Sequence, residues 1–187
     1  ISLSVLIFGT LALKSPELIF SDAPIRFIIG SVNLEARLIE IITERKSNKE
    51  TIIKYLNKIN PRAKSIGAVN CISKSGSKII GNNTDWYGFS KMLVQNEINV
   101  TGKEVIILGA GGVAKAVIFA LGQLGVKKIR LLNRTLSRAQ KLESDIISAH
   151  LIEQADKIIK DNSILINCTS IGMDDNSSPV HKSLISG

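Results

Sequence analysis

Residues 109–114, Gly-Ala-Gly-Gly-Val-Ala, have the types and the spacing of a turn that binds a dinucleotide. In the pattern G-x-G-x-x-G/A the first glycine permits a tight turn, and the second lets a pyrophosphate approach the backbone. The small third residue lets the next helix pack against the sheet, and the free N–H groups of that helix face the pyrophosphate. The predicted cofactor-binding residues are Gly109, Ala110, Gly111, Gly112, Val113 and Ala114. The alternative is an ordinary glycine-rich turn between a strand and a helix.

The residues that end the next strand indicate which cofactor this turn binds. A site for NAD has Asp or Glu there, which bonds the ribose 2′-hydroxyl. This chain has Asn133 followed by Arg134, with Arg138 one helical turn later. A carboxylate would repel a 2′-phosphate, whereas a guanidinium forks onto it with charge-assisted hydrogen bonds. The sequence therefore predicts NADP(H), and the alternative is a pair of solvated arginines at the start of a helix.

A β-α-β unit is expected to position this turn. The apolar run Val105–Leu108 predicts a buried parallel strand, and an apolar pattern at helical spacing follows the glycines. Gly125 is typical of a helix end, and Lys128–Leu132 predicts the second strand. Because strand, helix, glycine stop and second strand are all present, the motif is stronger evidence here than it would be alone.

A further apolar strand, Ser163–Asn167, ends in the loop Cys168–Met173. Between the second strand and this one we expect a helix from Arg138 to about Ser148 and a shorter helix at residues 153–160. Ligands in an open α/β sheet lie beyond the carboxyl ends of the strands. The loop residues predicted to line the nicotinamide pocket are Thr169, Ser170 and Met173.

The first hundred residues mix helical and strand patterns. We expect a loop entering a helix within residues 1–20, helices at residues 34–42 and 49–59, and a short helix from Pro61 to Ile66. Two strands are expected around a turn at residues 73–78.

A polar run, Asn82–Asp85, then precedes an amphipathic helix that ends near Asn96. We place the domain boundary at about residues 99–102. Residues 1–100 then form an N-terminal α/β domain for the substrate. Residues 101–187 form a doubly wound parallel sheet of the Rossmann type for the cofactor, so the predicted fold class is α/β.

The composition allows a globular protein that binds anions. Of the 187 residues, 44% are hydrophobic, which is enough for a core, and the formal net charge is +8. A positive balance suits a phosphate-rich cofactor and a carboxylate substrate. Aromatic residues make up only 4%, the lysines are dispersed, and no nucleic-acid motif appears, so we expect no nucleic-acid partner.

The cysteines, the histidines and the apolar runs indicate in which compartment the protein lies and whether it binds a metal. Cys71 and Cys168 lie far apart in apolar surroundings, which predicts buried free thiols in a reducing compartment, the cytoplasm. With two histidines and no metal-ligand spacing, we expect no metal site. No apolar run has the length of a membrane span and no signal peptide is visible, so we expect no membrane association. The chain opens without Met, and we expect it to be a piece of a longer protein, cut at both ends.

Seven segments in a fixed order resemble the shikimate dehydrogenase family. They are Ser2-Leu-Ser4, Lys49-Glu50, Ile66-Gly-Ala-Val-Asn70, Asn83-Thr-Asp85 with Gly88-Phe89, Gly109-Ala-Gly-Gly112, Asn133-Arg-Thr135 with Arg138, and Ile166-Asn-Cys-Thr-Ser-Ile-Gly-Met173. The resemblance extends over nearly the whole chain and adds Thr135 to the predicted cofactor site. It implies a two-domain enzyme that reduces 3-dehydroshikimate to shikimate with NADPH, on the pathway to chorismate and the aromatic amino acids. It also implies a small-molecule substrate, and either a monomer or a homodimer.

The resemblance implies roles for residues of the first domain. Ser2 and Ser4 match serines that hold the substrate carboxylate, and Asn70 and Asp85 match residues that bind ring hydroxyls. Lys49 matches the catalytic lysine, with Asp85 as its partner. Hydride transfer leaves negative charge on the carbonyl oxygen, which an ammonium group can stabilise and protonate while a carboxylate keeps the lysine positioned and charged.

The segment before Lys49 departs from the family pattern. The family has Asn-Val-Thr, a residue, Pro and another residue before its lysine. Here residues 44–48 read Glu-Arg-Lys-Ser-Asn, with Ser47 at the proline position. Val5 also replaces a usual proline, and the family's C-terminal helices, with a substrate-binding Gln, would lie beyond Gly187. Two alternatives stay open: a quinate dehydrogenase on the same residues, which would more often use NAD, and a non-catalytic NADP-binding sensor.

Overall fold

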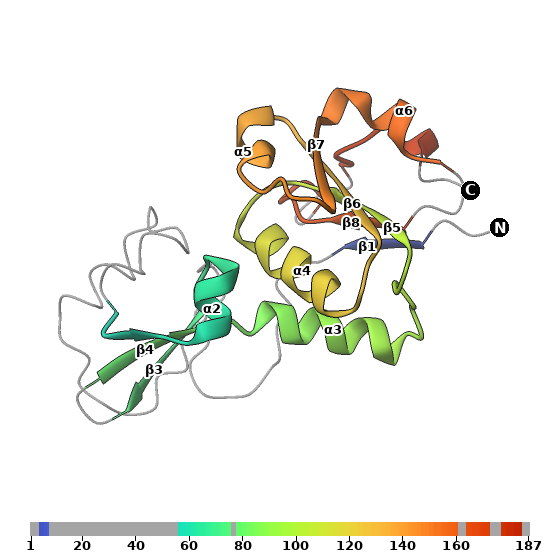
Figure 1. Ribbon diagram of the computed structural model, residues 1–187. Helices are drawn as coiled ribbons and strands as arrows, with labels where there is room; N and C mark the ends of the chain where they lie inside the picture. The colour runs from blue at the N-terminus through green and yellow to red at the C-terminus, as the bar shows by residue number, and fades with distance from the viewer. Residues whose placement is uncertain (1–3, 8–55, 76–77, 161–163, 173–176, 185–187) are drawn as a thin grey trace. The chain divides into compact units, whose positions relative to one another are not determined.

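The computed structural model describes residues 4–7, 56–75, 78–160, 164–172 and 177–184 (Figure 1). The chain divides into two compact units: unit 1 comprises residues 1–11 and 87–187, and unit 2 comprises residues 12–86. The division falls within helix α3 (Asp85–Gln95). The predicted boundary near residues 99–102 stays a prediction.

A five-stranded parallel sheet organises unit 1. Its strands lie in the order β1-β8-β5-β6-β7, and every neighbouring pair is parallel. The strands are β1 (Ser4–Ile7), β5 (Glu104–Leu108), β6 (Lys128–Asn133), β7 (Ile147–Leu151) and β8 (Ile164–Asn167). The helices are α4 (Gly112–Gln123), α5 (Leu136–Gln140) and α6 (Ala155–Ile158), with short 3-10 helices η2 (Ile152–Gln154) and η3 (Lys182–Leu184).

The connectivity of this sheet creates a place for a ligand. After β5 the chain moves outward through β6 and β7, and it then returns to the opposite side of β5 as β8. The order of strands therefore reverses beside β5, and in open α/β sheets ligands lie at such a reversal, outside the carboxyl ends of the strands. The α/β class and the parallel Rossmann-type sheet predicted from the sequence are confirmed.

Alternation along the strands accounts for the core of unit 1. Successive side chains of a strand point to opposite faces. Residues from β5, β6 and β8 pack on one face with residues that follow β7 and β8: Ile106, Leu108, Leu132, Leu165, Ala155, Ile159 and Val180. Val105 and Ile107 alternate with these, are fully buried, and point to the other face. The buried side chains of α4 are mostly alanines, which let a helix approach a sheet closely.

Unit 2 contains a smaller sheet in the order β2-β4-β3, with β2 (Lys58–Ile59), β3 (Cys71–Ser75) and β4 (Lys78–Asn82). The β3–β4 pair is antiparallel and the β2–β4 pair is parallel. Helix α2 (Pro61–Ile66) begins with a proline at its first position and ends at Gly67, which has φ +69°. Its buried Ala63 packs with Val69 and Ile72.

Three expected elements differ from the structure. The helix expected from Arg138 to Ser148 is replaced by α5 and β7, because the segment from Ile147 pairs in parallel with β6. The helix expected to run to Ile59 gives way to β2, which pairs with β4. The strand β1 takes the place of part of the expected N-terminal loop, since its apolar residues pair with β8.

Within the described ranges, no helix combines the length and the apolar character that crossing a membrane requires.

Candidate functional site

The glycine turn after β5 has the geometry that its pattern predicts. Gly109 has φ +98°, a conformation that side-chain-bearing residues rarely adopt, and its N–H donates to Leu132 O at 2.8 Å. A Cβ atom at Gly109 would lie 3.0 Å from Thr169 Cγ2 and 3.1 Å from the carbonyl of Cys168. Glycine is therefore required here both by the backbone conformation and by the close approach of the loop after β8.

Gly111 serves a different purpose. It caps α4 in an extended conformation (φ −89°, ψ −171°) that any residue can adopt, and a Cβ atom there would meet nothing within 4 Å. The open space lies where the first N–H groups of α4 lack acceptors within the helix. Ala114 is fully buried, as close packing of helix and sheet demands. The turn thus offers a backbone surface and a helix start to an anion.

The end of β6 presents two arginines. Asn133 Nδ2 donates to Thr135 O at 2.8 Å, which tightens the turn before α5. Arg134 is exposed ahead of this helix, and Arg138 is exposed within it. No carboxylate ends β6. This end of the strand therefore suits a phosphate better than a hydroxyl group.

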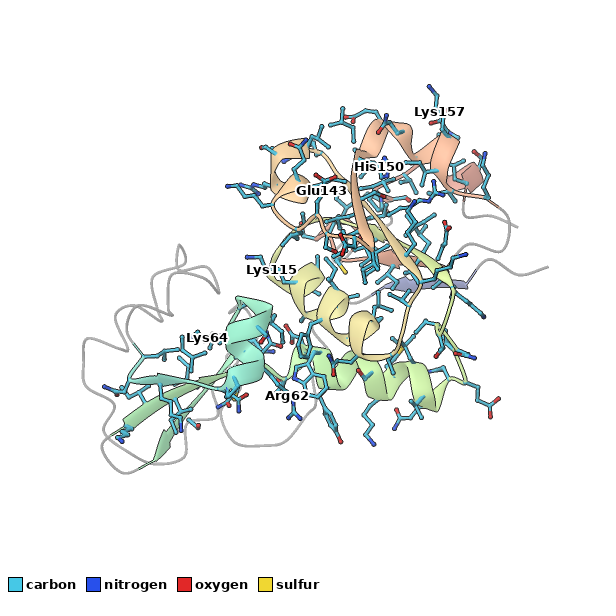
Figure 2. All side chains as sticks on the ribbon, viewed as in Figure 1. Arg62, Lys64, Lys115, Glu143, His150 and Lys157 are labelled. Carbon is cyan, nitrogen blue, oxygen red and sulfur yellow. The ribbon has the colours of Figure 1, made fainter. Side chains whose placement is uncertain are left out.

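The neighbouring strand β7 carries a histidine, His150, whose surroundings disfavour its positively charged form. His150, labelled in Figure 2, lies on β7. It is paired with Leu132 in the register, and its Nε2 lies 2.9 Å from Ser148 Oγ. Burial and the nearby Arg130 and Lys128 lower the pKa of His150 below its ordinary value of 6.5, and Glu143 opposes this in part. The charged form of His150 is therefore disfavoured, and the cationic side chains that follow the end of β6 are those of the exposed Arg134 and Arg138.

The loop after β8 folds around Asn167, a residue that we did not predict from the sequence. Asn167 is buried, its Oδ1 accepts from Thr169, and its Nδ2 donates to Ile171 O. Thr169 is half-buried beside Gly109, and Ser170 is exposed. Met173 lies outside the described residues. An asparagine at the end of an apolar strand, two residues before a threonine, is a turn signal that could have identified Asn167.

The two thiols are not activated. Burial raises the pKa of Cys168, at the end of β8, from 9.0 to about 12, and it also raises the pKa of Cys71. Both are free cysteines. Since a thiolate is the reactive form, neither cysteine has the character of a nucleophile.

In unit 2 the structure brings two of the predicted substrate-binding residues together. Asn70 Nδ2 donates to Asp85 Oδ1 at 2.5 Å and to Thr84 Oγ1 at 3.2 Å. Asn70 Oδ1 accepts from the Thr84 N–H at 2.8 Å. Asn70 precedes β3 and Asp85 begins α3, so residues far apart in the chain present one polar cluster.

A second buried asparagine supports this cluster. Asn83 Nδ2 donates to Ala68 O at 3.0 Å, and its Oδ1 accepts from the Asp85 N–H at 3.0 Å. Nearby, the Arg62 guanidinium lies over the Trp86 ring, with its carbon 5.1 Å from the centroid. These contacts connect α2 and the segment before β3 to the start of α3. We did not predict Asn83, because its position in a polar run gives no sign that it is buried.

Other predicted residues lie outside this description. Lys49, Ser2 and Met173 fall outside the described residues, so the predicted pairing of Lys49 with Asp85 stays a prediction. The backbone of Ser4 begins β1 and pairs with Ile164.

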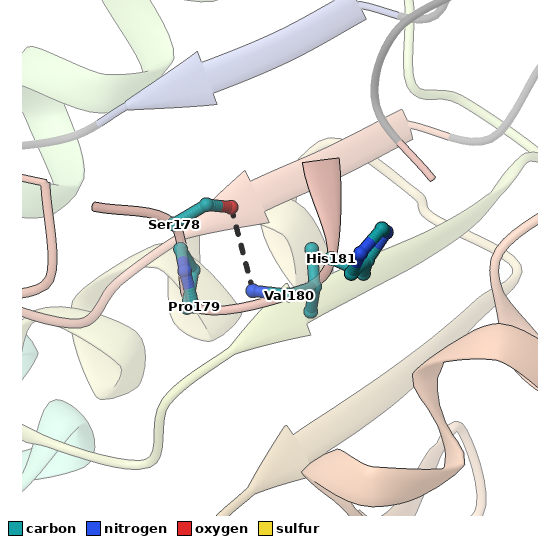
Figure 3. Close-up of a pocket in the computed structure, with 4 residues that line it drawn as sticks. All are labelled: Ser178, Pro179, Val180 and His181. Atoms are coloured by element: carbon teal, nitrogen blue, oxygen red, sulfur yellow. Dashed lines mark hydrogen bonds between the residues drawn. The ribbon is translucent and has the colours of Figure 1, made fainter. Parts of the chain in front are cut away.

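Two hollows in unit 1 lie away from these residues. Figure 3 shows Ser178, Pro179, Val180 and His181, which line an open hollow of 720 Å³. A smaller one of 280 Å³ lies between the end of α3 and the end of α4, lined by Val94 and Leu124 among others. The described lining of neither hollow includes a predicted site residue. Among the described residues, no three or more His, Cys, Asp or Glu side chains gather as a metal site.

Comparisons with known proteins agree with the resemblance. The family model for shikimate / quinate 5-dehydrogenase matches residues 92–173. A shikimate dehydrogenase (NADP(+)) of Symbiobacterium thermophilum is 35% identical over 137 residues, which cover 68% of this chain and 47% of the relative.

Solved structures give the same result. The shikimate dehydrogenase of Aquifex aeolicus matches with a TM-score of 0.65 and 37% identity, covering 73% of this chain and 51% of that one. The enzyme of Thermus thermophilus, in complex with NADP(H) and shikimate, matches with a TM-score of 0.64 and 32% identity, covering 80% of this chain and 58% of that one. The chain spans about half the length of the first curated relatives that it matches. In sequence and in fold, the chain belongs to the shikimate / quinate 5-dehydrogenase family.

Proposed function

We propose that this protein is an NADP-dependent shikimate dehydrogenase, which reduces 3-dehydroshikimate to shikimate in the pathway to chorismate. The observation that best supports this substrate is the hydrogen bond between Asn70 and Asp85. An amide and a carboxylate held side by side can donate to and accept from adjacent hydroxyl groups of a ring. Ser2 and Ser4 would hold the substrate carboxylate. In this proposal residues 1–100 bind the substrate and residues 101–187 bind the cofactor.

The proposed cofactor is NADP(H), which supplies or accepts the hydride when it is bound. Gly109–Ala114 would hold the pyrophosphate against the start of α4, with Gly111 leaving room for its approach. Arg134 and Arg138 would hold the 2′-phosphate, while Asn133 and Thr135 shape the turn that presents them. Thr169, Ser170 and Met173 would line the nicotinamide pocket.

Protonation of the carbonyl oxygen is the step that side chains of this protein must perform. We assign it to Lys49, whose ammonium group can stabilise developing negative charge and donate a proton. Asp85 would hold that ammonium group in place and bond a hydroxyl of the ring. The carboxylate of Asp85 accepts from Asn70 Nδ2, and the Asp85 N–H donates to Asn83 Oδ1, so that both the side chain and the backbone of Asp85 are held.

A steady-state assay at the absorbance band of reduced nicotinamide tests this function. We expect the protein to oxidise shikimate with NADP, to turn over more slowly with NAD, and to lose turnover by orders of magnitude as Lys49→Ala while still binding NADPH. Lys64→Ala is the matched control, since Lys64 is an exposed lysine on α2 (Figure 2).

The same assay separates the alternatives. Cofactor binding without any absorbance change would identify a sensor, and preferential turnover of quinate with NAD would identify a quinate dehydrogenase. Normal turnover of Lys49→Ala would refute the assignment of the lysine.

A further inference from the structure

We propose that Asn167 is a positioning residue of the cofactor site, which holds the loop after β8 against the glycine turn after β5. This inference rests on the proposed function, since it assumes that the turn binds NADP(H). From the sequence we did not assign Asn167 to the cofactor site. Its role follows from three features of unit 1: the hydrogen bonds of its amide, its burial, and the contact between the loop and the turn.

Both the oxygen and the nitrogen of the Asn167 amide bond the loop that follows it. Its Oδ1 accepts from the N–H of Thr169 at 2.9 Å and from the hydroxyl of Thr169 at 2.7 Å. Its Nδ2 donates to the carbonyl of Ile171 at 3.0 Å. The Thr169 hydroxyl accepts in turn from the Ile171 N–H at 3.2 Å. One side chain thus fixes the backbone at two points of the loop.

Burial makes this arrangement specific. Asn167 is only 5% exposed, and a buried amide is costly unless its donors and acceptors are paired. The preceding residues of β8, Ile164–Ile166, are apolar and buried, so an apolar side chain would also fit the pattern of the strand. The buried amide therefore serves the geometry of the loop rather than the packing of the sheet.

The loop that Asn167 folds lies directly against Gly109. The Cys168 N–H donates to Leu108 O at 2.8 Å, so the chains run side by side where β5 and β8 end. The methyl group of Thr169 and the carbonyl of Cys168 occupy the space that a Cβ atom of Gly109 would need. The position of Thr169 therefore limits where the turn from Gly109 to Gly111 can lie. Asn167 sets that position through its two bonds to Thr169.

The test is NADPH affinity as a function of pH in the variant Asn167→Asp. A carboxylate keeps the acceptor for Thr169 but places its second oxygen against the carbonyl of Ile171, where Nδ2 donates in the native protein. Protonation of that oxygen restores the donor. Because burial and the carbonyl both favour the protonated form, we expect recovery of the bond as pH falls.

We expect NADPH to bind Asn167→Asp about tenfold more weakly than the native protein at pH 8, because the buried carboxylate then faces the carbonyl of Ile171 without a hydrogen bond between them. The affinity of Asn167→Asp for NADPH should approach the native value as pH is lowered. The affinity of the control variant Asn99→Asp should stay in a constant ratio to the native affinity over the same pH range. The KM for NADPH should rise more than kcat falls. Asn99→Asp is the control, because exposed Asn99 accepts from the Thr101 N–H through Oδ1, which a carboxylate preserves.

A second variant keeps the inference testable if Asn167→Asp does not fold. Thr169→Ser retains the hydroxyl that bonds Asn167 and removes the methyl group that lies against Gly109. We expect an affinity for NADPH about threefold weaker at every pH, from the loss of the contact made by the methyl group of the half-buried Thr169. Native affinity in Thr169→Ser, or a pH-independent native affinity in Asn167→Asp, would overturn the inference.

The outcome for the native protein separates the inference from the proposed function. Native protein that binds NADPH but does not oxidise shikimate would refute the proposed function. The NADPH affinity of Asn167→Asp would then still test the role of Asn167. Native protein that binds no NADPH would overturn both.

Discussion

Replacing Gly109 and Gly111 separately by alanine distinguishes folding from cofactor binding within one turn. Gly109 has φ +98°, and a Cβ atom there would lie 3.0 Å from Thr169 Cγ2 and 3.1 Å from the Cys168 backbone. Gly111 has φ −89° and open space around its Cβ position. The two residues are two positions apart, so they share the same helix and sheet but differ in what a methyl group would meet.

The expected cost of Gly109→Ala is large. An alanine held at positive φ costs about 1–3 kcal/mol, and overpacking against Thr169 and Cys168 costs about 1–3 kcal/mol more. The reduced entropy of the unfolded chain offsets about 0.4–1 kcal/mol. We therefore expect the free energy of unfolding to fall by about 1–5.5 kcal/mol, the sum of the two costs less the offset.

The expected cost of Gly111→Ala is small for folding and large for binding. Alanine is a poorer helix cap than glycine, but it also restricts the unfolded chain, so the free energy of unfolding should change by less than about 1 kcal/mol. Its methyl group would occupy the space through which the pyrophosphate approaches. We expect NADPH affinity to fall by at least about tenfold, since losing one good bond to a charged group costs 1.5–3 kcal/mol.

Urea denaturation followed by circular dichroism measures the first quantity, and titration with NADPH measures the second. The single tryptophan, Trp86, lies in unit 2, so amide exchange of β5 should accompany the denaturation to report on unit 1. Equal stability of Gly109→Ala and the native protein would refute the steric argument. Native NADPH affinity in Gly111→Ala would refute the placement of the pyrophosphate.

The remaining predictions concern both proposed sites and one thiol. Asn83→Asp removes the donor to Ala68 O, and we expect kcat to fall about tenfold with NADPH affinity unchanged; an equal loss of both would contradict a local role. Arg134→Ala should raise the KM for NADPH at least about tenfold and leave that for NADH unchanged, and an equal rise for both would argue against a 2′-phosphate contact. Burial raises the pKa of Cys168 from 9.0 to about 12, so the folded protein keeps the thiol proton to a higher pH than the unfolded chain does. The contribution of this proton to the free energy of unfolding is complete below pH 9 and is lost as pH rises toward 12. Cys168→Ala should weaken this alkaline decline in urea titrations, and an unchanged decline would show that another group causes it.

The strand-turn-helix-strand segment around the glycines could be predicted from sequence because each part has a local signal. An apolar run, a glycine turn, a helical pattern and Gly125, which has φ +71°, follow one another without interruption. Helix α2 was also predictable, since Pro61 marks its start and Gly67 its end. In both cases the local preference and the tertiary structure agree.

The segment after Arg138 shows where local signals fail. Residues of good helical propensity continue well past Gln140, where α5 ends. Pairing with β6 extends the chain from Ile147 onward, and hydrogen bonds to a neighbouring strand outweigh weak helical preferences. The register of β7 with β6 depends on the finished sheet, so no window of the sequence contains it.

The buried amides show why the sites were only partly predictable, since Asn70 was predicted from the sequence and Asn83 and Asn167 were not. The buried polar side chains in the described part of the chain are all asparagines, namely Asn70, Asn83 and Asn167. Each bonds a residue that the sequence does predict: Asn70 and Asn83 bond Asp85, and Asn167 bonds Thr169. A polar group is buried at a net cost unless it is paired, so these amides mark the loops whose shape matters most. Since an amide does not titrate, it holds that shape unchanged across the pH range over which a neighbouring acid or base must exchange protons.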